Sequence, residues 1–343
     1  MIADLLYELV QIPGPTGFEN RVASRLNILL KEHVDEIYID KIGNVIAKIE
    51  GTEGKRSLML EAHMDTVSMV VQKVDEFIWF DRLGWINFRT LPGTAVLILG
   101  KDRDIPGVVC SPSAHFEAGD TELWIDVGNR QNDVSVGDPI VFDMPVRWLD
   151  DDKTLLASHS IDDRVSCSVM VELARRLTKK PKHNIYLVGA VQEEINGLGV
   201  RHALRQVSPD WFIALDTGFA QDALPDKNKT VPLHTGIGVR RLSFCQPADR
   251  MYPATANFAS PRLNKLLIDA ASKLNIPFHI DVSTRTFADH HISYEVNPEI
   301  DSTLMFIARR YSHSPQEIID IKNAEHAVDI LYQAIINLDS WDE

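Results

Sequence analysis

Residues 57–65 read SLMLEAHMD, a largely apolar run that ends in a histidine and an aspartate. A run of this kind is typical of a strand that is buried on both faces of a parallel sheet. His63 and Asp65 follow it, at the edge where open α/β sheets place their functional groups. This stretch therefore predicts both a fold class and one corner of a site.

Helical and extended patterns alternate on both sides of this run. Residues 19–32 carry apolar side chains at helical spacing, and two short extended runs follow them at 36–39 and 44–49. Beyond residue 158 the alternation continues with helices at 165–177, 197–207, 260–274 and 324–338, and with buried strands at 184–191 and 211–215. Alternating units of this type predict an α/β fold, with a doubly wound mixed sheet and helices on both faces.

The sequence pattern of residues 67–157 differs from that of the flanking segments, because short β-rich runs there alternate with Gly, Pro and Asp turns. Such a pattern is typical of a small β-barrel or β-sandwich. We therefore expect a discontinuous catalytic domain, residues 1–67 and 156–343, interrupted by a β-barrel domain at 68–155 that serves oligomerisation or lines the pocket.

Composition excludes several classes of function. The net charge of −14 repels phosphate backbones, so nucleic-acid binding is not expected. No stretch approaches the roughly 20 apolar residues of a membrane span, and the N-terminal segment, with Asp4 and Glu8, is amphipathic and unlike a secretory signal. Three scattered cysteines favour a reducing compartment, and so a cytoplasmic protein.

Carboxylates and imidazoles stand at five edges of the predicted elements. They are His63 with Asp65, Asp162 with Asp163, Glu193 with Glu194, Asp216, and His313. Each alone is equally compatible with a solvated strand end or a helix cap. Together they form the type of ligand set that suits zinc, cobalt or manganese.

A hydrolase that uses two metal ions needs a bridging carboxylate, further ligands for each ion, and a free carboxylate that accepts a proton from water. Adjacent glutamates such as Glu193 and Glu194 meet the last need, since neighbouring side chains diverge and only one has to ligate. Asp65 lies two residues from His63 and projects to the same side of an extended backbone. It is therefore suited to orient that histidine.

The set resembles the M42 family of metallo-aminopeptidases almost from end to end. The matching motifs are PGPTGFE at 13–19, IGN at 42–44, HMD at 63–65, DDR at 162–164, VQEE at 191–194, LD at 215–216 and RYSHS at 310–314. The resemblance implies an aminopeptidase that acts on short peptides with two divalent ions, zinc before cobalt or manganese. It also implies a homo-oligomer, commonly a tetrahedral dodecamer assembled partly through the β domain.

By the same resemblance, each site residue has an expected role. Asp162 would bridge the ions, Glu193 would be the general base and acid, and Asp65 would orient His63. His63 and Asp216 would be the terminal ligands on one side of the pair, with Glu194 and His313 on the other side or exchanged.

Three stretches depart from the family pattern, namely Thr66-Val67-Ser68, Ile195-Asn196-Gly197, and Phe287-Ala288-Asp289 with His290 and His291 after it. The first is closer to the M20 carboxypeptidases and deacylases, which leaves a dimetal amidase or deacylase on N-acyl amino compounds as the alternative activity. The 99-residue separation of His63 from Asp162, with a β-rich segment between them, favours M42. A metal-free binding or scaffold protein of the same fold is a further alternative.

Overall fold

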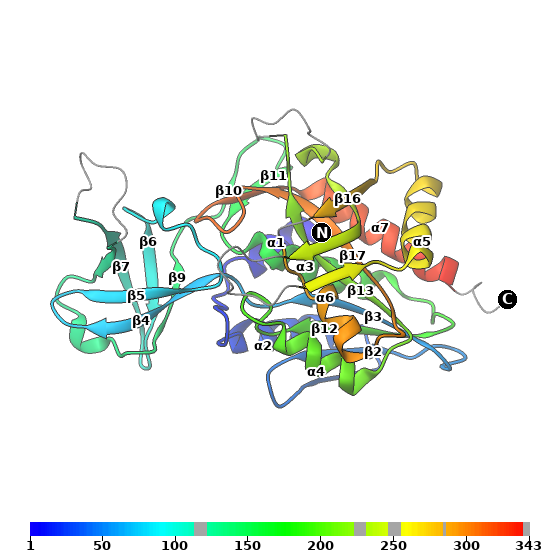
Figure 1. Ribbon diagram of the computed structural model, residues 1–343, viewed down its shortest axis with the longest axis horizontal. Coiled ribbons are helices and arrows are strands. Elements are labelled where there is room, and N and C mark those ends of the chain that lie inside the picture. Colours follow the sequence, from blue (N-terminus) through cyan, green and yellow to red (C-terminus); the bar gives the residue numbers. More distant parts are fainter. Residues whose placement is uncertain (113–121, 223–230, 246–254, 284–285, 339–343) are drawn as a thin grey trace.

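The computed structural model describes residues 1–112, 122–222, 231–245, 255–283 and 286–338. It contains a large α/β body and a smaller closed β-barrel beside it (Figure 1). The fold class is the predicted one: a mixed sheet covered by helices, with a barrel inserted in the chain.

One mixed sheet forms the centre of the body, in the order β1-β2-β12-β3-β13-β17-β18-β11-β10. The strands along this path are β1 Glu36–Ile39, β2 Val45–Ile49, β12 Asn184–Ala190, β3 Ser57–His63, β13 Trp211–Phe219, β17 Asp301–Arg310, β18 Glu317–Asp320, β11 Leu155–Ser158 and β10 Arg147–Trp148. A branch of β14 Ile237–Cys245, β15 Thr255–Phe258 and β16 His279–Ser283 joins the sheet through β17.

The middle of this sheet is parallel. Strand β3 runs parallel to both β12 and β13, and β13 runs parallel to β17. His63 is paired with Ala190, so the ends of β3 and β12 coincide. Side chains that follow these two strands therefore reach the same edge of the sheet.

Helices cover both faces of the sheet, which explains why all seven residues of β3 are buried. One face carries α1 Ile2–Leu9, α2 Asn20–Leu30, α3 Ile161–Arg176, α5 Pro261–Lys273 and α7 Ile321–Leu338, and the other carries α4 Leu198–Val207 and α6 His290–Val296. In α2 the buried residues Val22, Ala23, Leu26 and Leu30 recur at helical spacing and face the core. Within the described ranges, no helix combines the length and the apolar character that a membrane span requires.

The barrel closes in the order β4-β5-β8-β7-β6-β9. Its strands are β4 Ser68–Val74, β5 Ile78–Leu83, β6 Ala95–Leu99, β7 Asp104–Cys110, β8 Trp124–Asp126 and β9 Pro139–Phe142, and the short 3-10 helices are η1 Phe88–Thr90, η2 Gln131–Asp133 and, in the body, η3 Leu233–Thr235. Along β7, Ile105, Gly107 and Val109 are buried while their neighbours are more exposed, as expected for a barrel wall. The barrel has its own apolar core, and the ion pair of Arg21 with Asp104 ties it to α2.

Most predicted elements are present within a few residues of their expected ends. The sequence pattern predicts no strand at residues 301–310, where the central strand β17 lies. Strand β10 pairs with β11 in the large sheet, so the chain has returned to the body by Arg147. The domain boundaries at 67–68 and 155–156 stay a prediction.

Candidate metal centre

The side chains predicted to act together meet at the edge of the sheet where β3 and β12 end. His63 is the last residue of β3, and Glu193 and Glu194 follow β12. Asp216 lies inside β13, which continues to Phe219, and Asp162 lies in the first turn of α3. The topology therefore collects residues that are distant in the sequence around one point.

Asp162 lies at the centre of this group. Its Oδ1 is 3.2 Å from Nε2 of His63, and its Oδ2 is 3.2 Å from Nε2 of His313. Burial alone would raise the pKa of Asp162, but the Arg309 guanidinium and the two imidazoles bring it well below its usual range. One ionised carboxylate thus presents one oxygen to each of two imidazoles.

Each imidazole has a second acidic neighbour. Oδ1 of Asp216 is 3.9 Å from Nε2 of His63, and Oε2 of Glu194 is 3.5 Å from Nε2 of His313. Two ligand groups result, and they share Asp162. Asp216 lies beside His63 and Glu194 lies beside His313, while the assignment of each ligand to an ion stays a prediction.

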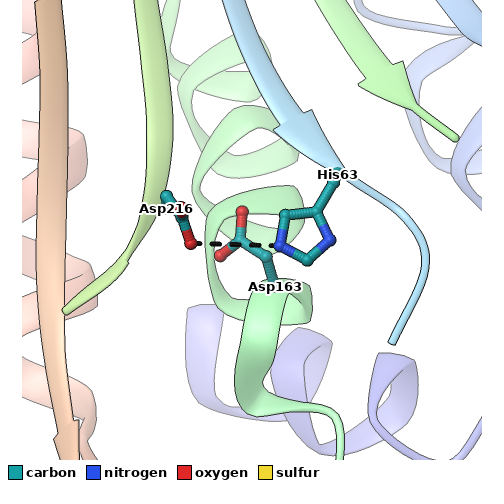
Figure 2. A group of neighbouring side chains, drawn as sticks. All are labelled: His63, Asp163 and Asp216. Atoms are coloured by element: carbon teal, nitrogen blue, oxygen red, sulfur yellow. Dashed lines mark ion pairs between the residues drawn. The ribbon is translucent and has the colours of Figure 1, made fainter. Parts of the chain in front are cut away.

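Asp163 is a residue to which the sequence assigned no role. Figure 2 shows His63, Asp163 and Asp216 facing one another, and their ligand atoms lie within 4.8 Å of each other. Oδ2 of Asp163 is buried without a hydrogen-bond partner. Burial and the nearby carboxylates Asp216 and Asp162 raise the pKa of Asp163 well above its ordinary value, against the opposing effect of His63. In the sequence, the two adjacent acids at 162–163 were the feature that could have pointed to a role for Asp163.

A second group of potential metal ligands consists of His63, Asp162 and Glu194, whose ligand atoms also lie within 4.8 Å of one another. Burial is the main cause that raises the pKa of Glu194 to about 7 and that of Asp216 to about 6, and Asp162 adds repulsion in both cases. A bound cation would lower the pKa of these carboxyl groups and so keep them ionised at neutral pH. Oxygen and imidazole donors at this density fit divalent metal ions.

Glu193 lies close to the same point without a short contact to an imidazole. Its Oε2 is 4.0 Å from Nε2 of His63. Burial, together with Asp289, Glu194 and Asp216, raises the pKa of Glu193 well above its ordinary value, and His63 partly offsets this. A buried carboxyl group with a raised pKa is suited to general base and acid chemistry near neutral pH.

Asp65 holds the pair of glutamates more directly than it holds His63. Its carboxylate accepts hydrogen bonds from the backbone N–H of Glu193 at 3.0 Å and of Glu194 at 3.1 Å, and from the hydroxyl of Thr16 at 2.9 Å. Nδ1 of His63 lies 3.1 Å from the Asp65 backbone oxygen and 3.4 Å from the carboxylate. Asp65 therefore positions both the imidazole and the two carboxylates that follow β12.

Two further partners of the site come from segments that the sequence did not single out. Nδ1 of His313 lies 2.8 Å from the backbone oxygen of Trp85, which belongs to the barrel. Arg309, near the end of β17, is buried and donates a hydrogen bond to Oδ2 of Asp162. The arginine was visible after the apolar run 304–308, but its partner depends on the three-dimensional fold.

His290 and His291, which follow one of the stretches that depart from the family pattern, are buried in α6 and do not lie in a polar loop. Their rings lie against each other at 4.3 Å between centroids. Neither belongs to the groups of potential ligands formed by the described residues.

Comparison with known proteins gives consistent matches. The sequence model of the M42 glutamyl aminopeptidases matches residues 43–330. Lysyl aminopeptidase from Pyrococcus furiosus is 27% identical over 356 aligned residues, which cover 99% of this chain and 98% of that protein.

Solved structures agree with the sequence comparison. An aminopeptidase from the archaeon Desulfurococcus kamchatkensis superposes with a TM-score of 0.89 at 27% identity and covers 97% of this chain and 94% of its own. TET1 peptidase from Pyrococcus horikoshii, which can assemble into a tetrahedron or a large octahedral shell, has a TM-score of 0.81 at 21% identity, with 97% and 98% covered.

Proposed function

Because this chain belongs to the M42 glutamyl aminopeptidase family and is an aminopeptidase, we propose that it removes N-terminal residues from short peptides with two divalent metal ions. The observation that carries the proposal is the position of Asp162, which turns one carboxylate oxygen to His63 and the other to His313. A carboxylate between two imidazoles is the arrangement that a pair of bridged ions requires.

The donor set fits such a pair. His63 and Asp216 would hold one ion, His313 and Glu194 would hold the other, and Asp162 would be shared. The buried Oδ2 of Asp163, which has no hydrogen-bond partner, also fits a site that is completed by a cation. We propose zinc as the ion, because imidazole and carboxylate ligands suit it.

When bound, the ions supply polarisation of the scissile carbonyl and a lowered pKa for the attacking water. Glu193 accepts the proton of that water and then donates it to the leaving amine. Its raised pKa, caused mainly by burial, suits both steps near neutral pH. Asp65 keeps Glu193 in place through the backbone N–H of that residue.

Replacement of Glu193 by Gln tests this assignment. The amide cannot accept the proton, so kcat should fall by about 10²–10⁴-fold while two metal ions stay bound. Asp162→Asn should instead lose metal, because the shared carboxylate is removed. Glu172→Gln on α3, partly exposed and paired with Arg175 and Arg176, is a matched control that should keep activity and metal. Full activity in Glu193→Gln would reject its role as base.

The substrate class is tested separately by comparing aminoacyl-anilides with N-acyl amino compounds. Cleavage of the anilides alone supports the aminopeptidase, and cleavage of the N-acyl compounds alone supports the deacylase alternative.

We also propose that the chain forms a homo-oligomer. The proposal rests on the similar TET1 peptidase of Pyrococcus horikoshii, which can assemble into a tetrahedron or a large octahedral shell. Light scattering that gives the mass of a single chain, 38.6 kDa, would reject it. The cytoplasmic location stays a prediction.

A further inference from the structure

Arg309 places a fixed positive charge against the shared carboxylate. Its side chain is only 3% exposed, and Nη2 donates to Oδ2 of Asp162. Nε donates to Oε1 of Glu317 at 2.9 Å, and Nη2 also donates to the hydroxyl of Ser312 at 2.8 Å. Asp162, together with Glu317, raises the pKa of Arg309 despite burial, so this group stays charged.

Glu317 fixes this arrangement from the other side. Its Oε2 accepts a hydrogen bond from the backbone N–H of Asp162 at 3.1 Å, and its Oε1 accepts one from the backbone N–H of His313 at 2.8 Å. The same carboxylate therefore holds Arg309, Asp162 and His313. A buried guanidinium held at both ends has little freedom to move away from Asp162.

The consequence is an asymmetry between the two oxygens of Asp162. Oδ1 faces the ring of His63, whereas Oδ2 faces the ring of His313 and also accepts from Arg309. A cation held by His313 and Glu194 would share its bridging oxygen with a permanent positive charge. A cation held by His63 and Asp216 would receive the other oxygen.

We propose that Arg309 makes the two metal positions unequal, so that the ion at His63 and Asp216 binds first and the ion at His313 and Glu194 binds second and more weakly. This inference rests on the proposed dinuclear function and adds an order of loading to it. Arg309 acts here as a positioning residue that sets the affinity of one site through Asp162.

Titration of metal-stripped protein with Zn²⁺ or Co²⁺ in a calorimeter tests the proposal without any measure of activity. The wild-type protein should bind two ions in steps whose Kd values differ by about tenfold or more, because a unit charge within several ångströms of an ion has an effect of at least that size even at an effective dielectric constant of about 20. Arg309→Met should tighten the second step by about tenfold or more. It should tighten the first step by a smaller factor, because Arg309 donates to Oδ2 of Asp162 and not to Oδ1.

Two control variants define the cause. Arg309→Lys retains the charge and should keep the steps apart. Arg310→Met removes a neighbouring arginine that pairs with Asp222 away from the site, and should match the wild type. If circular dichroism shows that Arg309→Met does not fold, Arg309→Gln carries the same expectation, because it also removes the charge.

A second pair of variants assigns each step to a position. His313→Ala should retain the tight step, and His63→Ala should lose it. Two equal steps in the wild-type protein, or an Arg309→Met variant with unchanged or weaker second binding, would overturn the inference while leaving the dinuclear function intact. A wild-type protein that binds one ion or none rejects the dinuclear function itself, and this inference with it.

Discussion

Removal of the metal should make the stability of the protein depend steeply on pH, because the buried ligands then lack their cations. The pKa of Glu194 rises from 4.5 to about 7 and that of Asp216 from 3.8 to about 6, chiefly through burial. One pKa unit corresponds to about 1.4 kcal/mol, so each of these shifts alone would change the free energy of unfolding by roughly 3 kcal/mol between low and neutral pH. Since the two carboxylates belong to one interacting cluster, we expect a total of about 3–6 kcal/mol rather than more.

The sign follows from the proton count. Between pH 4 and 7 the folded metal-free protein binds more protons at Glu194 and Asp216 than the unfolded chain does. The free energy of unfolding should therefore fall as pH rises through this range. The pKa of His313 rises from 6.5 to about 9, against the effect of burial, because Glu194 and Asp162 favour its charged form. That contribution is complete below pH 6.5 and is lost as pH rises towards 9, so both effects run in the same direction.

Urea unfolding at fixed protein concentration, with and without metal, measures this dependence. In the loaded protein the ligands are unprotonated at neutral pH, so most of the slope should vanish and the stabilisation by metal should grow with pH. In metal-free Glu194→Gln, the slope of the unfolding free energy against pH should be smaller by up to about 1.4 kcal/mol per pH unit between pH 4.5 and 7. This is the contribution of one titrating proton, which the substitution removes. Metal-free protein whose stability is flat or rises from pH 5 to 7.5 would refute the reasoning.

Two other substitutions test the support of the site. In Asp65→Asn, one of the two backbone N–H groups of Glu193 and Glu194 would face the side-chain NH₂ group and lose its acceptor. We expect a loss of about 2–4 kcal/mol in urea unfolding. Calorimetry should show about 10–100-fold weaker metal binding. Gly84→Val should also lose about 2–4 kcal/mol, because φ is +89° and an added Cβ would lie only 2.9 Å from Cγ1 of Val67 and 3.4 Å from Cβ of Glu194. Gly93→Val, at φ +82° in open space, carries the backbone strain alone and should lose less; equal losses would contradict the steric argument.

The convergence of the site could be predicted from the sequence because it depends on a general property of sheets. His63 ends one apolar strand and Glu193 and Glu194 follow another, and parallel strands bring such positions to a common edge. Their pairing with further ligands could not be predicted in the same way. It depends on whether Asp216 or Glu194 lies nearer to a given imidazole, and no local pattern encodes that distance.

The barrel illustrates the same limit on a larger scale. Short β-rich runs between turns predicted a β domain here, although not strand β7, but nothing in the sequence predicted the contact of the Trp85 backbone oxygen with His313. A backbone carbonyl leaves no mark in residue identity. The separation of these two residues by 228 positions also means that only the closed fold brings them together.

Charge balance explains why so many acids are tolerated at one point. Asp162, Asp163, Glu193 and Glu194 are buried around a single position, and Asp216 beside them is 14% exposed. An isolated buried carboxylate is costly unless it is protonated or paired. Protonation is the response of the metal-free protein, as the raised pKa values of most of these groups indicate. Asp162 alone has a pKa well below its ordinary value, since a guanidinium and two imidazoles surround it. The carboxylate that stays ionised without metal is thus the one that we propose as the shared ligand of two ions, so that ligand would already be in its binding form before the first ion arrives.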